Sequence, residues 1–382
     1  MGEKDFWIGF SVFPGIGPVT FQSLLERFGN AKNAWFAPEK DLEKILKEKK
    51  TKDFLTFREQ FDFGVYKKRL EKAEVSIVTL RDEIYPKGLK EIKNPPFVLY
   101  VRGDSVILGN EAKYKTVPGE VTPESDSGQA RMTIAIVGTR KITQYGRDVT
   151  ELFTSAISNT GCSIVSGLAM GVDAVAHQTT IDNGGKTIAV LGCGVDCVYP
   201  RENQQLYDAI IESGGVIVSE VPIGMSPNRG TFPARNRIIA GLSQAVSVTE
   251  GTEDSGALIT AEFGIEYGRK VFAVPGPITS SLSKGPYKLI EKGARLVTHP
   301  KDVLQELQIN NYELRIEKKK KIIGESKEEQ MLIDLLANEP FSFDEIVRST
   351  NIHSSKIATL LSLMEIKGII KTLSNGDFGI AN

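Results

Sequence analysis

The chain is organised around six short runs of apolar, mostly β-branched residues, each followed by a turn or loop, most of them rich in Gly, Ser or Pro. Runs without polar alternation are typical of strands buried on both faces of a parallel sheet. Helical stretches separate most of them, and this alternation predicts a doubly wound, mostly parallel α/β sheet. The six predicted strands are Ile134–Val137, Ser163–Val165, Thr187–Leu191, Val216–Ser219, Ala245–Thr249 and Val271–Val274.

The turns after these strands are expected to meet at one edge of the sheet, where ligands bind in folds of this class. One turn, Asp254-Ser255-Gly256, opens a helix, and free backbone N–H groups at a helix start attract anions. Just upstream, Phe232 lies close in sequence to Arg235, Asn236 and Arg237. An aromatic surface beside phosphate donors is what a single-stranded nucleic acid requires.

Cations are expected on the converging loops. The net charge of the chain is −1, so a nucleic-acid site has to be a local basic patch rather than a property of the whole surface. An alternative interpretation pairs some of these arginines with acidic residues as structural ion pairs, above all Arg237. The predicted loop cations are Arg140, Arg229, Arg235, Arg237 and Lys284, and the acidic partners are Glu220, Glu250, Glu253 and Asp254.

The sequence does not favour catalysis. It lacks a Walker A loop, a complete dinucleotide fingerprint and a Gly-x-Ser-x-Gly elbow. His177 is the one histidine placed for a triad, and packing explains it better. Asp173, Glu220 and Glu250 follow strands, where helix capping competes with acid–base chemistry. No catalytic residue, cofactor or metal is expected. The N-terminus lacks an apolar signal segment and no run is long enough to span a bilayer, so a cytoplasmic location is expected.

Accessory domains are predicted before and after the sheet domain in the sequence. Residues 1–68 look helical, and the Phe13–Pro18 turn is typical of a helix-hairpin-helix or of a tight turn between packed helices. The sheet domain covers residues 69–310, with a Gly-, Pro- and Ser-rich insertion at 109–131. A charged linker, 311–325, precedes residues 326–382, whose three helices and hairpin predict a winged helix. Its third helix sets Lys356 and Lys367 against Glu365, a poor match for a duplex, so a protein-contact or regulatory role is equally consistent.

Six motifs together resemble the DNA-processing protein A (DprA, or Smf) family. They follow one another in the family's order over about 180 residues, and the flanking domains match the family's usual accessory domains. The motifs are Ile134–Arg140 (IAIVGTR), Ser166–Asp173 (SGLAMGVD), Thr187–Pro200 (TIAVLGCGVDCVYP), Phe232–Ser243 (FPARNRIIAGLS), Ser255–Ala261 (SGALITA) and Gly268–Gly276 (GRKVFAVPG).

The resemblance implies an extended Rossmann-like fold and a homodimer that binds single-stranded DNA, protects incoming DNA and loads the RecA recombinase, as in natural transformation. It implies no known catalysis. Carried over by motif, it assigns phosphate contacts to Arg140, Arg229 and Arg235, and base stacking to Phe232. Backbone or hydroxyl donors come from Ser166, Gly167, Ser255 and Gly256, and the converging segments add Gly138, Asn236 and Lys284 to the predicted DNA-binding residues.

The chain departs from the family pattern at three places. Met170 stands where the family usually has Arg, Tyr287 stands where it usually has Asn, and the insertion at 109–131 is unusual. Two alternatives stay open. One is a nucleoside-monophosphate N-glycosidic hydrolase, although Val248-Thr249-Glu250 replaces the Pro-Gly-Gly run of that class. The other is a regulator that binds duplex DNA through the winged helix.

Overall fold

The computed structural model describes residues 1–108, 132–228, 230–309, 324, 326–336, 340–350, 352–372 and 376–380. The chain forms two compact units, Met1–Tyr312 and Glu313–Asn382. Three predicted features lie outside the described residues: the insertion at 109–131, Arg229 and the linker at 311–325, of which only Gly324 is described. The predicted domain boundaries therefore stay predictions.

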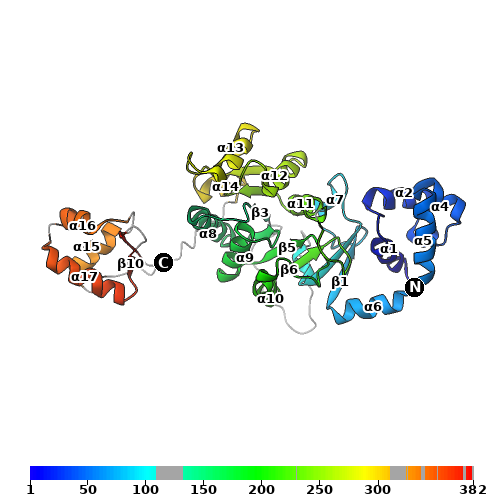
Figure 1. Ribbon diagram of the computed structural model, residues 1–382, viewed down its shortest axis with the longest axis horizontal. Coiled ribbons are helices and arrows are strands. Elements are labelled where there is room, and N and C mark those ends of the chain that lie inside the picture. Colours follow the sequence, from blue (N-terminus) through cyan, green and yellow to red (C-terminus); the bar gives the residue numbers. More distant parts are fainter. Residues whose placement is uncertain are drawn as a thin grey trace. The chain divides into compact units, whose positions relative to one another are not determined.

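A nine-stranded sheet forms the centre of the larger unit, in the order β1-β2-β6-β5-β4-β3-β7-β8-β9 (Figure 1). The six predicted strands are β3 to β8, and they pair in parallel, which confirms the doubly wound, mostly parallel sheet. The strands are β1 Val75–Thr79, β2 Val98–Gly103, β3 Thr133–Val137, β4 Ser163–Ser166, β5 Thr187–Leu191, β6 Val216–Ser219, β7 Ala245–Val248, β8 Lys270–Ala273 and β9 Arg295–Leu296.

The first two strands add an antiparallel edge to the parallel sheet. Strand β1 pairs with β2, and β2 pairs with β6, so that Val101 lies opposite Val218. Both strands are short apolar runs, and the direction in which β2 joins the sheet depends on its pairing with β6, a segment more than a hundred residues away.

Helices cover both faces of the sheet because neighbouring residues of a buried strand point to opposite sides. Val165 shares a core with Leu258, whereas Ile164 shares another with Phe153. None of the described helices is long and apolar enough to cross a membrane. The first face carries α7 Lys87–Lys90, α11 Thr231–Leu242, α12 Gly256–Glu266 and α13 Lys284–Glu291; the second carries α8 Gln144–Ser158, α9 Val172–Asp182, α10 Gln204–Glu212 and α14 Pro300–Glu306.

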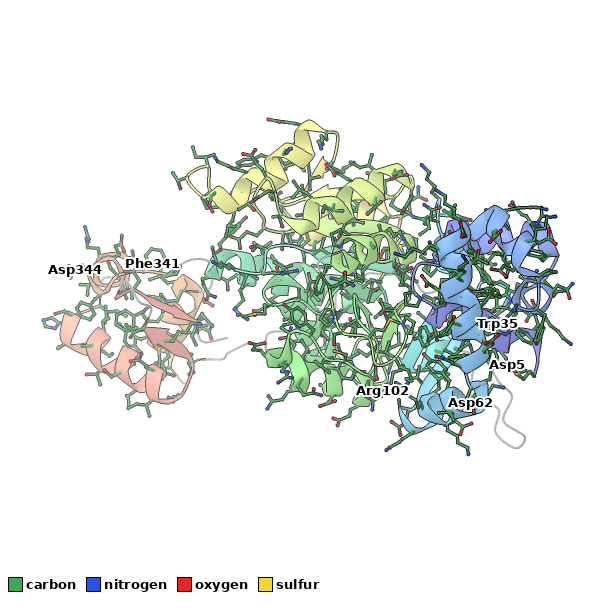
Figure 2. The ribbon with its side chains drawn as sticks, turned by 45° about the vertical axis from the view of Figure 1, so that its right-hand side comes forward. Asp5, Trp35, Asp62, Arg102, Phe341 and Asp344 are labelled. Carbon is green, nitrogen blue, oxygen red and sulfur yellow. The ribbon has the colours of Figure 1, made fainter. Side chains whose placement is uncertain are left out.

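Six helices form the N-terminal part of the larger unit, which confirms its predicted helical character. Trp35, labelled in Figure 2, has ring centroids 5.2 Å from those of Phe10 and Phe54. The hydroxyl groups of Ser11 and Tyr100, 2.7 Å apart, link these helices to the sheet. The helices are α1 Glu3–Val12, α2 Pro18–Phe28, α3 Ala31–Trp35, α4 Glu39–Leu46, α5 Glu48–Gln60 and α6 Phe63–Lys72.

The smaller unit is a winged helix, as the sequence predicts. Its helices are α15 Lys327–Leu336, α16 Phe343–Thr350 and α17 Ser354–Ile366, and its antiparallel hairpin joins β10 Ile370–Thr372 to β11 Phe378–Ile380. Lys356 contacts Glu328 at 2.6 Å and Lys367 contacts Glu329 at 2.9 Å. The two lysines near the third helix are thus already paired with carboxylates of α15.

Candidate nucleic-acid interface

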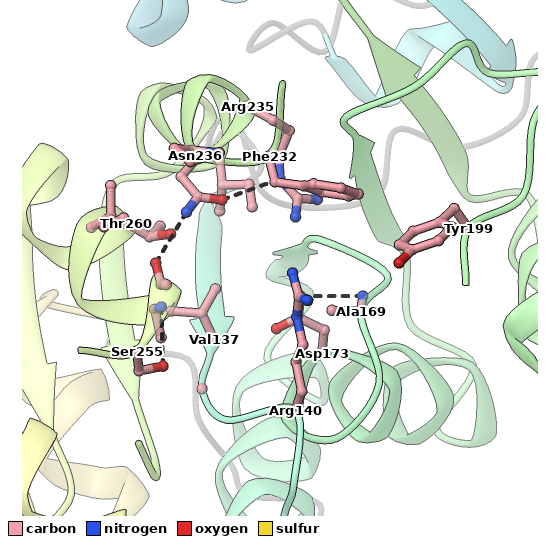
Figure 3. A pocket seen from close by; sticks show the side chains of 16 residues that line it. Val137, Arg140, Ala169, Asp173, Tyr199, Phe232, Arg235, Asn236, Ser255 and Thr260 are labelled. Carbon is pink, nitrogen blue, oxygen red and sulfur yellow. Dashed lines mark hydrogen bonds between the residues drawn. The ribbon is translucent and has the colours of Figure 1, made fainter. Parts of the chain in front are cut away.

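A pocket of about 590 Å³ opens at the carboxyl ends of the central strands (Figure 3). Such a position is the expected ligand site of a doubly wound sheet. Apolar, aromatic and charged side chains contribute to it. The residues that line it are Val137, Gly138, Arg140, Ala169, Asp173, Tyr199, Phe232, Pro233, Arg235, Asn236, Ile239, Ser255, Gly256, Ala257, Ile259 and Thr260.

Two aromatic rings and one guanidinium lie together in this pocket. The ring centroids of Tyr199 and Phe232 are 5.4 Å apart and their planes are inclined by 42°. The guanidinium carbon of Arg140 lies over the Phe232 ring, 5.6 Å from its centroid, in a cation–π arrangement. Arg140 is exposed and makes no ion pair with any residue of the described chain. It is therefore a cation available to a ligand.

Arg235 lies deeper and has a different environment. The sequence places it on a loop; this is wrong, because it lies within α11, with only 6% of its surface exposed. Its guanidinium donates to the carbonyl of Gly167 at 2.7 Å and to that of Val190. Its Nε also donates to Asn236 Oδ1 at 3.2 Å. Arg235 thus joins the ends of β4 and β5 to α11, and much of its donor capacity is already used.

Asp173 and His177 on α9 are also buried. One carboxylate oxygen of Asp173 accepts from the backbone N–H groups of Gly167 at 3.1 Å and Ala169 at 3.4 Å. Burial raises the pKa of Asp173, while the Arg235 charge acts in the opposite direction. Burial, assisted by Arg235, lowers the pKa of His177 to about 3, and its Nδ1 lies 2.7 Å from Thr187 Oγ1. Asp173 thus organises the turn after β4, and His177 joins α9 to β5, in agreement with the packing interpretation of His177.

The other two acidic residues considered for catalysis are engaged as well. Glu250 accepts from the backbone N–H of Thr143 at 3.0 Å and from its hydroxyl at 2.6 Å. Glu220 forms an ion pair with Arg237, as expected for that arginine. Burial raises the pKa of Glu220, and the Arg237 charge opposes this effect. These contacts support the structural interpretation of both carboxylates.

The start of α12 closes another side of the pocket. Ser255 is its N-cap and accepts from the backbone N–H of Ala257 at 3.3 Å. The amide of Asn236 donates to the carbonyl of Gly256 at 3.0 Å, while its oxygen is bound by Arg235. Asn236 therefore lines the pocket, and its amide nitrogen holds α11 to the start of α12.

A glycine permits the close packing of the turns after β3 and β4. Gly171 has φ +78°, and a Cβ there would lie 2.8 Å from the carbonyl oxygen of Arg140 and closer still to that of Thr139. The next backbone N–H, of Val172, donates to Thr139 at 3.1 Å. The turn that carries Arg140 thus rests directly on the backbone at Gly171.

The structure brings together most, but not all, of the predicted site residues. Ser166 and Gly167 do not line the pocket: the Ser166 hydroxyl donates to the Ile136 carbonyl at 2.6 Å, and the Gly167 N–H is bound by Asp173. Lys284 opens α13 outside the pocket, 4.0 Å from Glu253. The residues that do line the pocket are Gly138, Arg140, Phe232, Arg235, Asn236, Ser255 and Gly256.

The departures from the family pattern lie near this region. Met170 is 48% exposed beside Gly171 and is not among the lining residues. Tyr287 on α13 donates its hydroxyl to the Gly276 carbonyl. Tyr199 was missed by sequence reasoning, although an aromatic residue in a turn after a predicted strand is a usable signal. No three His, Cys, Asp or Glu residues of the described part of the chain form a metal-binding group.

Comparisons with known proteins agree with this architecture. A family model described as DNA recombination-mediator protein A matches residues 76–308, and one described as DprA winged helix domain matches residues 317–376. Protein Smf of Synechocystis is 36% identical over 316 residues, covering 80% of this chain and 73% of that protein. DNA processing protein DprA of Bacillus subtilis is 39% identical over 237 residues, which cover 62% of this chain and 73% of that protein.

Two solved structures have similar folds. DprA from Streptococcus pneumoniae matches with a TM-score of 0.65 and 34% identity, covering 79% of this chain and 97% of that one. DNA processing protein A from Helicobacter pylori matches with a TM-score of 0.51 and 28% identity, and the match covers 62% of this chain and 97% of that one. The latter structure is described in terms of its single-stranded DNA binding mode.

Proposed function

Because the chain belongs to the DNA recombination-mediator protein A family, also named DprA or Smf, we propose that it binds single-stranded DNA in the pocket at the carboxyl edge of its sheet. The proposal includes protection of incoming DNA and loading of the RecA recombinase onto it, as in natural transformation. The protein acts as a binding mediator rather than an enzyme. The observation that carries the proposal is the exposed Arg140 guanidinium beside the Phe232 ring.

The chemistry of the pocket supports this proposal. A guanidinium binds a phosphate through paired N–H donors, and a neighbouring ring stacks on a base of any sequence. The helix start at Ser255 and Gly256 adds backbone dipoles that favour an anion. Together these groups suit a strand whose phosphates and bases are both accessible, which is the state of single-stranded DNA.

A homodimer is part of the proposal, and the sheet offers a surface for it. Strand β9 is one of the two edge strands of the sheet, so one side of its backbone has no strand partner among the described residues. Leu296 on this strand is 48% exposed. An open edge with an exposed apolar side chain favours pairing with a second copy.

The two alternative functions receive less support. The hydrolase needs a free carboxylate in the pocket, but Glu250 is bound by Thr143 and does not line it. A regulator that binds a duplex through its winged helix needs free cations on the third helix. The lysines near that helix, Lys356 and Lys367, are paired with Glu328 and Glu329.

Replacing Arg140 with Ala is expected to weaken binding of single-stranded DNA about 5- to 30-fold, independently of sequence, because one charged phosphate contact is lost. The slope of log K against log salt should become shallower by about 0.7, the value of one phosphate on a single strand. Fluorescence anisotropy of a labelled oligonucleotide at several salt concentrations measures both quantities.

The matched control is Lys141→Ala, since Lys141 is the next residue, is exposed and does not line the pocket. This substitution should leave the affinity for single-stranded DNA within about twofold of the parental value. An Arg140→Ala protein with the parental salt slope would remove Arg140 from the site. Unlabelled duplex that competes as well as single strand would instead favour the winged helix.

A further inference from the structure

We propose that Tyr199 is a second stacking residue, so that the pocket holds two successive bases of a single strand, one on Tyr199 and one on Phe232. This inference rests on the proposed function, and it gives a role to a residue that lies in the motif Thr187–Pro200 but is not among the predicted DNA-binding residues. Figure 3 shows the two side chains close together, on different elements of the pocket. Phe232 lies in α11, whereas Tyr199 lies in the loop after β5.

The separation of the rings excludes a base sandwiched between them. A base inserted between two rings needs two layers of van der Waals contact, a separation of about 7 Å. The centroids of Tyr199 and Phe232 are 5.4 Å apart, and their planes are inclined by 42°. The rings therefore offer separate faces to two different bases.

The two rings differ in their exposure to solvent and in their contacts. Phe232 is half-buried and shares one face with the Arg140 guanidinium. Tyr199 is 44% exposed, and its one ring contact in the described structure is Phe232. Phe232 therefore has one face beside a cation, while Tyr199 presents aromatic surface that is already open.

The loop that carries Tyr199 is held in place by its neighbours. Gly194 donates its N–H to Met225 at 2.9 Å, and both carboxylate oxygens of Asp196 accept from Gly224 at 2.9 Å. Farther along, the amide of Asn203 donates to the carbonyl of Leu168 at 2.9 Å. Because the loop is fixed on both sides of Tyr199, positioning the ring for a base requires little ordering of the protein.

The same geometry selects an unstacked strand. Neighbouring bases of a duplex are parallel and rise by about 3.4 Å. Two bases that each lie on one of these rings are spread farther apart and inclined to one another, since the rings are 5.4 Å apart and tilted by 42°. A single strand adopts this arrangement easily, whereas a duplex has to break a stacked and paired step.

The test compares an oligothymidylate with an oligonucleotide of equal length and charge that carries abasic positions throughout its centre. Anisotropy measured on the full chain should show that Tyr199→Leu weakens binding of oligothymidylate about 5- to 30-fold, because stacking on one ring is lost. Binding of the abasic strand should change by less than twofold, and the salt slope should not change. Tyr199→Phe should restore the parental affinity.

The matched control is Phe36→Leu, which removes another exposed aromatic ring from the N-terminal helices. It should leave both affinities unchanged, and thermal unfolding should show that Tyr199→Leu is folded. Equal losses on both strands, or no loss on either, would overturn the role of Tyr199 while leaving the binding of single-stranded DNA intact. Failure of the parental protein to bind oligothymidylate at low salt would instead refute the proposed function.

Discussion

Replacing Arg235 with Met is expected to lower the free energy of unfolding of the larger unit by about 3 kcal/mol or more. The substitution leaves the carbonyls of Gly167 and Val190 without their donor and removes the positive charge that acts to lower the pKa of the buried Asp173. Urea unfolding measures the effect as a lower midpoint at an unchanged slope.

Two further variants separate stability from DNA contact. Arg201→Met, at an exposed arginine, should change stability by less than about 0.5 kcal/mol. Arg235→Lys keeps the charge but not the planar set of donors, so it should recover only part of the loss. If folded Arg235→Met binds single-stranded DNA as the parental protein does, Arg235 supports the pocket without contacting the strand. An Arg235→Met protein as stable as Arg201→Met would contradict the assignment of these hydrogen bonds.

Replacing Gly171 with Ala is expected to cost about 3 kcal/mol or more of stability and to reduce DNA binding as well. The new methyl group would have to occupy space held by the carbonyl oxygens of Thr139 and Arg140, and neither backbone atom can rotate away. The turn that carries Arg140 therefore has to move. Urea unfolding and anisotropy on the same preparation measure the two effects.

Gly161→Ala is the matched control for this substitution. Gly161 also has a positive φ, +84°, but a Cβ there has no neighbour within 4 Å. Its replacement should show the backbone strain alone, about 1–2 kcal/mol, and leave DNA binding unchanged. Equal effects of the two substitutions would mean that the contact between Gly171 and the Arg140 turn has no energetic importance.

The fold could largely be read from local patterns. Buried apolar runs predict the six parallel strands, and the Asn375-Gly376 pair, which is typical of tight turns, predicts the hairpin of the winged helix. The direction in which β2 joins the sheet could not be read in this way. It depends on the pairing of Val101 with Val218, a contact between residues far apart in sequence.

The site was less predictable because the sequence shows which groups are present but not which of them are already bound. Arg140 and Arg235 look alike in the sequence, yet one is exposed over a ring and the other is buried against carbonyls. The acceptors of Arg235 lie 45 and 68 residues away. The sequence does not predict Tyr199 as a site residue because its neighbour in space, Phe232, lies in the segment between β6 and β7, whereas Tyr199 follows β5. No local sequence pattern links the two residues.

The hydrogen bonds that tie the loops of the pocket together also bear on the kinetics of binding. Glu250 fixes the turn at Thr143, Asp196 fixes the loop before Tyr199, and Arg235 joins two strand ends to α11. A partner that is already rigid loses little freedom on association, so most of the ordering falls on the flexible strand. A strand stiffened in its bound shape should consequently dissociate more slowly, even though it gains no contact with the protein.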